Sequence, residues 1–413
     1  MMLVLLLPLT AAATHVHPTT VPSSLTTYDP TVAPSTVPTY APSSAPTMTK
    51  VPTTGVNMLG KLTASDGDEG FLFGSAVASD GDVVVVGAPQ CDYNGTAAGC
   101  AYVYAAPDWT EVAKLYASDA EAYTLFGSAV AVSGDFIAVG APNATGKVYL
   151  YEKMTAGEYS TTYWMEVAKL MQPLDPKDFQ PYQDFFGGAV ALEGDVLAVA
   201  SMGYDDPTPY VYDTGAVYVY VKQDDGSWMM TAMLEASDAE TSDQLGRSLA
   251  MSGNLIAAGA WLADVNSTLD AGAAYVFETE DGGYTWQEVA VLVASDPEAS
   301  ANFGFSIAVS EDVVVVGADD VGANSGAAYV YAKRFGFDEA AKLVSWDNKE
   351  GDELGLSVAA EGNLVIVGAE KHGGYWPQQP NASGAAYVWR TPDEGATWDE
   401  VAKLTAGGDA APG

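Results

Sequence analysis

The 413-residue sequence is poor in basic residues. It holds 16 lysines and arginines against 54 aspartates and glutamates, which gives a formal net charge of −38. Binding to nucleic acid or to an anionic membrane requires clustered positive charge, so both are poor partners for this chain. Cations or cationic partners are more compatible with the charge, although an acidic, well-solvated surface that favours solubility explains it more simply.

Cysteine and histidine are also scarce. The only two cysteines, Cys91 and Cys100, lie in one segment with the sequence CDYNGTAAGC, and no histidine lies nearby. A zinc site needs three or four ligands, so a local disulfide formed in an oxidising compartment is the better prediction. The three histidines are His15, His17 and His372, and their isolation in the sequence argues against histidine-based catalysis.

A long apolar run occurs only at the start of the chain. Residues 1–13 combine a short apolar run with a small-residue site at Ala11 and Ala13, which predicts a secretory signal peptide. No other segment approaches the about 20 apolar residues that cross a bilayer, so we expect no membrane span and a secreted or cell-surface location. Residues 14–56 are rich in Ser, Thr and Pro and predict a disordered, O-glycosylated stalk, which leaves residues 57–413 for the folded part.

The folded part consists of one pattern that occurs six times. Each copy has a Phe-Gly or Leu-Gly step, a short small-residue strand, a VVVGA-type strand, an AYVY-type strand and an EVAKL-type strand. The copies start near residues 73, 126, 186, 245, 303 and 354. A period of this length is typical of propeller blades, and the β-branched and aromatic residues predict four short strands per copy. The sequence therefore predicts an all-β propeller of six four-stranded blades.

The fourth strand pattern occurs once more than the others. It ends at a leucine in each case: Leu62, Leu115, Leu170, Leu234, Leu292, Leu343 and Leu404. Six blades with one spare strand agree with this count, and a seven-bladed propeller whose C-terminus is truncated is the alternative. We favour six blades, because the Pro-rich segment upstream has no composition from which a further blade could form.

The run FGSAVAxxGDxxxVGAP, at 73–89 and 126–142, followed by GxAYVY, resembles the FG-GAP repeat. This repeat is the blade unit of the N-terminal propeller of integrin α-chains and of many extracellular relatives. The resemblance covers about residues 58–404. It implies a propeller that acts in cell adhesion or ligand recognition outside the cell and has no chemistry of its own.

Calcium is the cofactor that the resemblance to this family raises. Integrin-type blades often hold calcium in a DxDxDGxxD loop between the first two strands, and here that loop is shortened to sequences such as SGD at 133–135. So short a loop cannot supply the six to eight oxygens that calcium takes, so the calcium sites of the family are not carried over. Weak candidates remain in acidic stretches before the first strand, where Asx turns are an equally good explanation: Asp66, Asp68, Asp238 and Asp243.

The face of the propeller that carries the Phe-Gly loops and the loops between strands two and three is the predicted ligand-binding face. All four N-glycosylation sequons lie in the latter loops, at Asn94, Asn143, Asn266 and Asn381, which favours an exposed face. The copies also differ most here, with bulky or charged residues after the repeat glycine and aromatic residues in nearby loops. The candidate ligand-binding residues are Arg247, Phe305, Leu356, Tyr204, Trp261, Tyr375 and Trp376, for which loop packing is the alternative role.

Three functions remain open at this stage. The first is a non-catalytic, integrin-α-like adhesion propeller that recognises an extracellular protein or glycan, and the second is a structural matrix or cell-wall glycoprotein. The third is a sialidase-like glycoside hydrolase, suggested by Asp-box sequences at 279–286 and 391–398. A sialidase needs a convergent arginine cluster, whereas Arg247, Arg334 and Arg390 are the only arginines, so we do not expect an enzyme.

Overall fold

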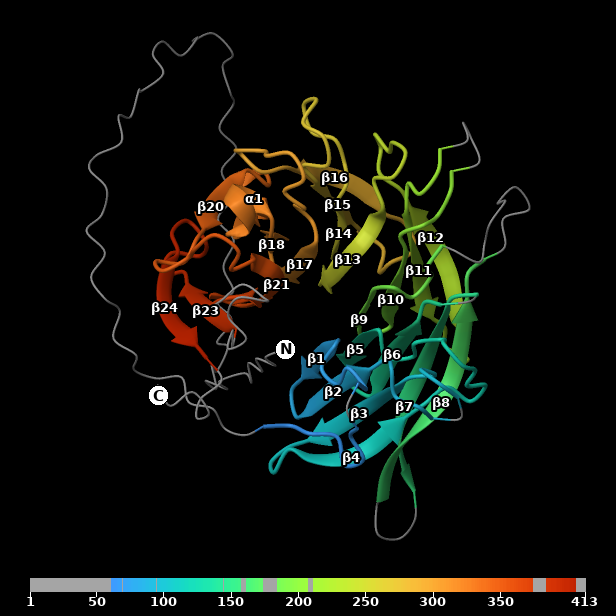
Figure 1. The fold of residues 1–413 in the computed structure, drawn as a ribbon. Helices are drawn as coiled ribbons and strands as arrows, with labels where there is room; N and C mark the ends of the chain where they lie inside the picture. The colour runs from blue at the N-terminus through green and yellow to red at the C-terminus, as the bar shows by residue number, and fades with distance from the viewer. Residues whose placement is uncertain are drawn as a thin grey trace, which may run out of the picture. The chain divides into compact units, whose positions relative to one another are not determined.

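The computed structural model describes residues 61–68, 70–93, 95–143, 145–156, 161–173, 184–206, 211–373 and 384–405. These residues belong to one compact unit and form six antiparallel sheets of four strands each, which are arranged around a common axis (Figure 1). The prediction of an all-β propeller with six four-stranded blades is confirmed, and no seventh sheet occurs in these ranges. The predicted signal peptide at 1–13 and stalk at 14–56 lie outside the described residues.

The strands of each sheet follow chain order from the axis outwards (Figure 1). The innermost strands are β1 (Val77–Asp80), β5 (Ala129–Ser133), β9 (Val190–Glu193), β13 (Leu245–Ser252), β17 (Ser306–Ser310) and β21 (Leu354–Glu361). The second strands are β2 (Val83–Ala88), β6 (Phe136–Ala141), β10 (Val196–Ser201), β14 (Leu255–Ala260), β18 (Val313–Ala318) and β22 (Leu364–Ala369).

The outer two strands of each sheet contain the aromatic and charged parts of the repeat. The third strands are β3 (Cys100–Ala105), β7 (Lys147–Ala156), β11 (Ala216–Lys222), β15 (Ala273–Glu278), β19 (Ala327–Ala332) and β23 (Ala385–Arg390). The outermost strands are β4 (Thr110–Leu115), β8 (Thr161–Met171), β12 (Trp228–Leu234), β16 (Gln287–Leu292), β20 (Glu339–Leu343) and β24 (Asp399–Leu404). The only helical segments among the described residues are α1 (Val321–Asn324) and the 3₁₀ turn η1 (Lys333–Phe335).

The four middle sheets are covered on both faces because each stands between two neighbours. Their second strands show this most clearly: every residue of β14 is buried, without the polar alternation of a half-exposed strand. Successive innermost strands pack against each other from β1 through β21. The described strands of the last and first sheets make no comparable contact, and accordingly β1 is largely exposed whereas β5 is largely buried.

Glycine pairs set the distance between neighbouring blades. A Cβ atom built on Gly87 in β2 would lie 2.0 Å from the carbonyl oxygen of Gly127, the repeat glycine of the next blade. The same contact joins Gly140 to Gly187, Gly259 to Gly304, and Gly317 to Gly355, while Ala200 takes this place in the third sheet. The backbones therefore approach more closely than any side chain would allow, which explains why both the Phe-Gly and the VVVGA glycines recur.

A β-bulge occurs between the third and fourth strands of all six sheets. In the first sheet Tyr104 is paired with Glu111 and Val103 with Ala113, so Val112 is the extra residue. Side chains three apart in a regular strand point to opposite faces, but the bulge places Glu111 and Lys114 on the same face as Tyr102 and Tyr104. The EVAKL motif is therefore a bulged strand whose two charges point the same way.

These two charged side chains bind the segment that precedes the first strand of each blade. In the first blade, Ser65 donates to Glu111 through its main-chain N–H and its hydroxyl, each at 2.8 Å. Asp66 accepts from the Tyr102 hydroxyl at 2.9 Å and from Lys114 at 2.6 Å. The corresponding aspartates of later blades are Asp119, Asp238, Asp296 and Asp347, each of which accepts from the first tyrosine of the third strand.

We expect Gly140→Ala to lower the free energy of unfolding by about 1 to 3 kcal/mol or more, because the new methyl group collides with the Gly187 backbone of the next blade. Gly134→Asn is the matched control: Gly134 has a φ of 54°, nothing lies near its built Cβ, and Asn tolerates this conformation. Urea denaturation of both variants measures the difference, and equal losses would contradict the role of the glycine pair.

Candidate functional site

Three of the predicted ligand-binding residues meet at one end of the sheets, next to the axis. Arg247 lies near the start of β13, Trp261 directly follows β14, and Phe305 directly precedes β17. The Arg247 guanidinium carbon lies 3.9 Å from the centroid of the Phe305 ring and 5.9 Å from the Trp261 ring. The two rings pack edge to face, 5.7 Å apart. We call these three residues the Arg247 cluster.

The Arg247 cluster is held in place by packing and by one hydrogen bond. The Trp261 indole N–H donates to the side-chain oxygen of Gln244 at 2.9 Å, which fixes the orientation of the ring. Arg247 carries its charge against two aromatic faces, a geometry that favours a guanidinium. Among the described residues its side chain has no hydrogen-bond or ion-pair partner, so its N–H donors remain available for a ligand.

Burial affects the charges around this cluster in opposite directions. Desolvation lowers the pKa of Arg247, and the nearby carboxyl of Asp319 opposes this effect. Asp319 is only 6% exposed, and burial raises its pKa to about 6, with a further contribution from Asp320. Asn302 donates to Asp320 at 2.8 Å and to Asp319 at 3.4 Å. The site therefore combines a guanidinium with a carboxyl that changes its charge in mildly acidic solution.

The sixth blade brings a second polar group to the same end of the sheets. Leu356 is partly exposed in β21, and the neighbouring Glu353 forms an ion pair with Lys371. His372, which appeared isolated in the sequence, contacts Asp352 through Nδ1 at 2.7 Å and Lys403 through Nε2 at 2.7 Å. Because an ammonium group only donates, Nε2 accepts and the imidazole proton lies on Nδ1 towards Asp352. Sequence spacing gave no indication of this cluster, since its members come from three separate segments.

The remaining candidates on this face are distributed differently. Tyr204 is 5% exposed and its ring packs edge-on against Tyr218, so it belongs to the core and we do not retain it as a ligand-binding residue. Asn143 and Asn266 lie in loops between second and third strands, as expected, with Asn266 exposed. Four further predicted residues lie outside the described ranges: Asn94, Tyr375, Trp376 and Asn381.

The weak calcium candidates have protein partners. Asp66 and Asp238 belong to the blade connections described above, and the Lys114 ammonium holds the pKa of Asp66 below its ordinary value. Asp243 accepts from the Glu240 N–H at 2.7 Å, and burial raises its pKa to about 6. Asp68 lies in the turn after Asp66, where its carbonyl accepts from the Phe71 N–H. Across the described ranges, no group of three or more His, Cys, Asp or Glu side chains is arranged to hold a metal ion.

Two further sequence features take the form that was predicted. Cys91 and Cys100 form a disulfide, with their Cα atoms 5.6 Å apart. In the Asp box at 279–286, Asp281 accepts from the N–H groups of Tyr284 and Thr285 and from the Thr285 hydroxyl. The Asp281 carboxylate is thus used by its own turn, and Asp393 bonds Thr397 in the same way. The two Asp boxes act as folding devices at the opposite end of the sheets from the Arg247 cluster.

We expect Asp319→Asn to stabilise the chain at neutral pH but not in acid. The pKa of about 6 in the folded chain exceeds the ordinary value of 3.8, so the contribution of Asp319 to stability is complete below 3.8 and is lost as pH rises through 6. The amide does not titrate, so the variant should gain about 2 kcal/mol over the wild type between about pH 4 and pH 8.

Thermal denaturation at several pH values measures this gain. Asp312→Asn, which removes the same charge from an exposed turn, is the control. A difference between Asp319→Asn and wild type that does not change with pH would contradict the assignment of a buried, protonatable carboxyl to this site.

Comparison with known proteins follows the fold. Two solved structures of Sqt1 from Chaetomium thermophilum are similar to this chain at 14% sequence identity. They have TM-scores of 0.49 and 0.47, cover 82% and 78% of this chain, and are covered over 73% and 70% of their own length. A likeness of this degree carries no argument about function. No curated protein matches the sequence.

A family model for the FG-GAP repeat matches the sequence six times, once per blade. The matched residues are 57–104, 109–151, 164–220, 228–277, 286–331 and 337–389. The matches span most of the chain, and each contains the first three strands of one sheet, in most cases after the outermost strand of the sheet before, so the resemblance noted in the sequence is confirmed. The chain belongs to the family of FG-GAP repeat proteins.

Proposed function

We propose that this chain is a non-catalytic propeller that acts outside the cell and recognises a protein or glycan with the face that carries the Arg247 cluster. The observation that carries the proposal is the position of Arg247. Its guanidinium packs on Phe305 beside the propeller axis, and within the described ranges its donors have no partner. A rigid, partly desolvated arginine next to aromatic rings is typical of the energetic centre of a recognition surface.

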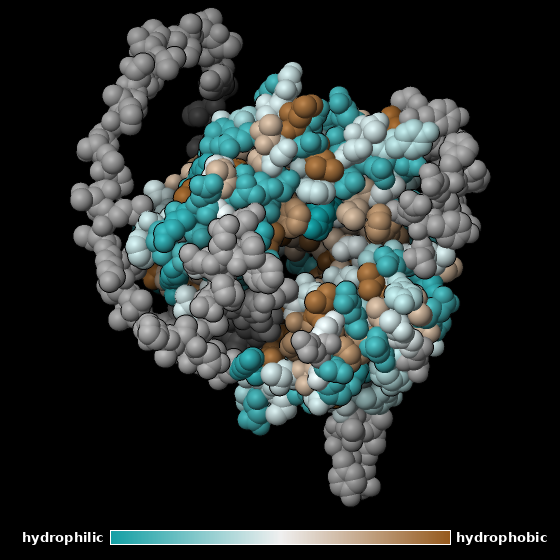
Figure 2. Space-filling view, in the orientation of Figure 1, coloured by the Kyte–Doolittle hydropathy of each residue, from teal (hydrophilic) through white to brown (hydrophobic). Residues whose placement is uncertain are grey.

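The fold and the disulfide support an extracellular role. The FG-GAP propeller is compatible with integrin-like ligand binding, and a disulfide persists in oxidising compartments. In the described part of the chain, no helix is long and apolar enough to span a membrane. The surface visible in Figure 2 is largely hydrophilic and is hollowed near the axis, between the innermost strands.

A non-catalytic role agrees with how the reactive groups are used. The Asp-box carboxylates Asp281 and Asp393 bond their own turns, and Arg334 binds the second of these turns. Arg247 is therefore the arginine left for recognition on the opposite end of the sheets. Adhesion through this face is the function that we favour over a structural matrix role or glycoside hydrolysis.

The test is a screen of the purified chain on glycan and matrix-protein arrays, with and without calcium. We expect a ligand whose binding falls at least about tenfold in each of the variants Arg247→Ala and Trp261→Ala. The first variant removes the guanidinium group, and the second removes a ring that supports it. Lys153→Ala, which removes an exposed cation from the rim of the second blade, is the charge-matched control. Unchanged binding in the Arg247→Ala variant would contradict recognition by this face, and no binding under any condition would favour the structural matrix function.

A further inference from the structure

The two Asp-box hairpins lie at equivalent junctions between blades. The hairpin between β15 and β16 packs against the third blade, where a Cβ built on Gly283 would contact Val196 and Val221. Thr231 of the third blade also donates to the Gly283 carbonyl at 2.7 Å. The hairpin between β23 and β24 packs in the same way against the fifth blade, with Gly395 next to Val313. The two junctions can therefore be compared residue by residue.

At the junction of the fifth and sixth blades, a guanidinium occupies the Asp-box turn. Arg334 follows β19 and donates through Nη1 to the Glu394 carboxylate at 2.8 Å. Its Nη2 donates to the main-chain carbonyl of Asp393 at 2.7 Å. The turn thus offers a carbonyl and a carboxylate to one planar cation, which is the arrangement that a guanidinium matches best.

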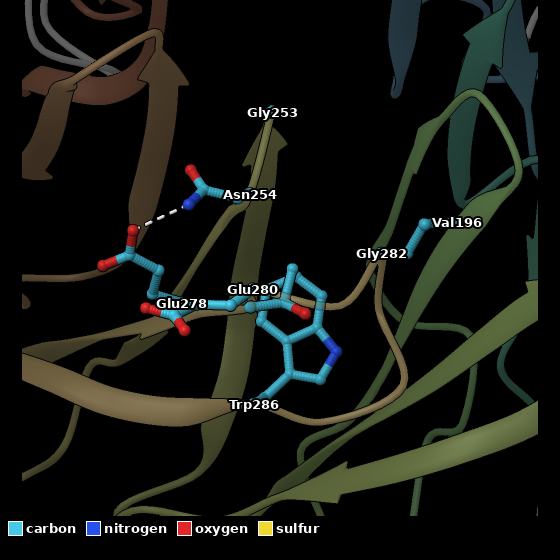
Figure 3. A pocket seen from close by; sticks show the side chains of 8 residues that line it. Val196, Gly253, Asn254, Glu278, Glu280, Gly282 and Trp286 are labelled. Atoms are coloured by element: carbon cyan, nitrogen blue, oxygen red, sulfur yellow. Dashed lines mark hydrogen bonds between the residues drawn. The ribbon is translucent and has the colours of Figure 1, made fainter.

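At the junction of the third and fourth blades, both side chains that fill this place are different. Gln223 stands where Arg334 does, and its amide turns back to donate to the Val221 carbonyl at 2.9 Å. Gly282 stands where Glu394 does, and nothing lies within 4 Å of a Cβ built on it. A cavity of about 370 Å³ remains between the blades (Figure 3). It is lined by Val196, Gly253, Asn254, Glu278, Thr279, Glu280, Gly282 and Trp286.

Among the described residues that line it, the cavity offers a cation one free carboxylate and an aromatic wall. Glu278 accepts from Asn254 at 2.7 Å and from Lys333, and the Lys333 ammonium holds the pKa of Glu278 below its ordinary value. The neighbouring Glu280 is exposed, and in the described part of the chain its carboxylate has no partner. The Trp286 indole N–H donates to Gly283 and stabilises the ring at the edge of the cavity (Figure 3).

We propose that this cavity binds an arginine side chain of a partner protein, at the junction equivalent to the one that Arg334 fills within the chain. The guanidinium donates to the Glu280 carboxylate and packs against Trp286, both of which line the cavity. The net charge of −38 favours the approach of such a cationic group. The site lies at the opposite end of the sheets from the Arg247 cluster, so it does not depend on the function proposed above.

The first experiment is calorimetric titration of the full chain with a short peptide whose only charged group is one arginine side chain. The matched peptide carries citrulline, which keeps the shape and loses the charge. We expect saturable binding of the arginine peptide and binding of the citrulline peptide that is weaker by about tenfold or more. A lysine peptide and calcium chloride, titrated separately, distinguish a guanidinium site from a general cation site.

Two variants connect the binding to the cavity. Glu280→Gln should weaken the arginine peptide by about tenfold, because a charged acceptor becomes neutral. The double variant Gln223→Arg with Gly282→Glu recreates the filled junction and should abolish binding. Glutamate is compatible with the backbone there, since Glu394 at the equivalent place has a φ of 56°.

Several results would overturn the proposal. They are no saturable binding at millimolar arginine peptide, equal binding of the citrulline, lysine or calcium ligands, and unchanged binding in Glu280→Gln. Circular dichroism shows whether the double variant folds, and if it does not, the Glu280→Gln result decides. The Arg247→Ala variant should bind the arginine peptide as the wild type does, which separates this site from the function proposed for the other face.

Discussion

The contact on which the whole propeller depends is that of one glycine backbone with another. Gly87 and Gly127, and the equivalent pairs at later junctions, bring adjacent blades closer than any Cβ would permit. This distance allows the second strands to be buried on both sides and brings the innermost strands together around the axis. Because close packing tolerates little change in volume, four junctions keep both glycines, and only the methyl group of Ala200 is accommodated in their place at the junction of the third and fourth blades.

A second constraint holds the segment that leads into each blade against its outer strands. The bulge in the fourth strand turns Glu111 and Lys114 to the same face, where they hold Ser65 and Asp66 of the incoming connection. Where the sequence departs from this pattern, the partners change: Met233 and Val291 stand at the lysine position in the third and fourth blades. The counterparts of Asp238 in other blades accept from both a tyrosine and a lysine. In the described part of the chain, Asp238 accepts from Tyr275 and has no lysine partner.

Both proposed binding sites lie where blades that fold alike carry different side chains. Arg247 replaces the small residue that follows the repeat glycine in the first three blades, and it rests on Phe305 of the next blade. At the other end of the sheets, Gln223 and Gly282 replace a bonded Arg334 and Glu394 and leave a cavity. In each case the repeat supplies the same rigid backbone. Two side chains that differ from those of other blades, one on each side of a junction, then determine what the junction can bind.

The sequence by itself determined the fold, because six copies of a four-strand pattern specify the strands, their order and the turns between them. It also determined the disulfide, the Asp-box turns and the position of Arg247 at the start of an innermost strand. Only the tertiary structure decided which side chains from separate segments meet. Tyr204 is buried against Tyr218 within the third blade, and His372 pairs with Asp352 and Lys403 within the sixth, whereas the empty place beside Gly282 lies between two blades. Such contacts depend on the distance between blades and on the bulge, and neither can be derived from spacing within one repeat.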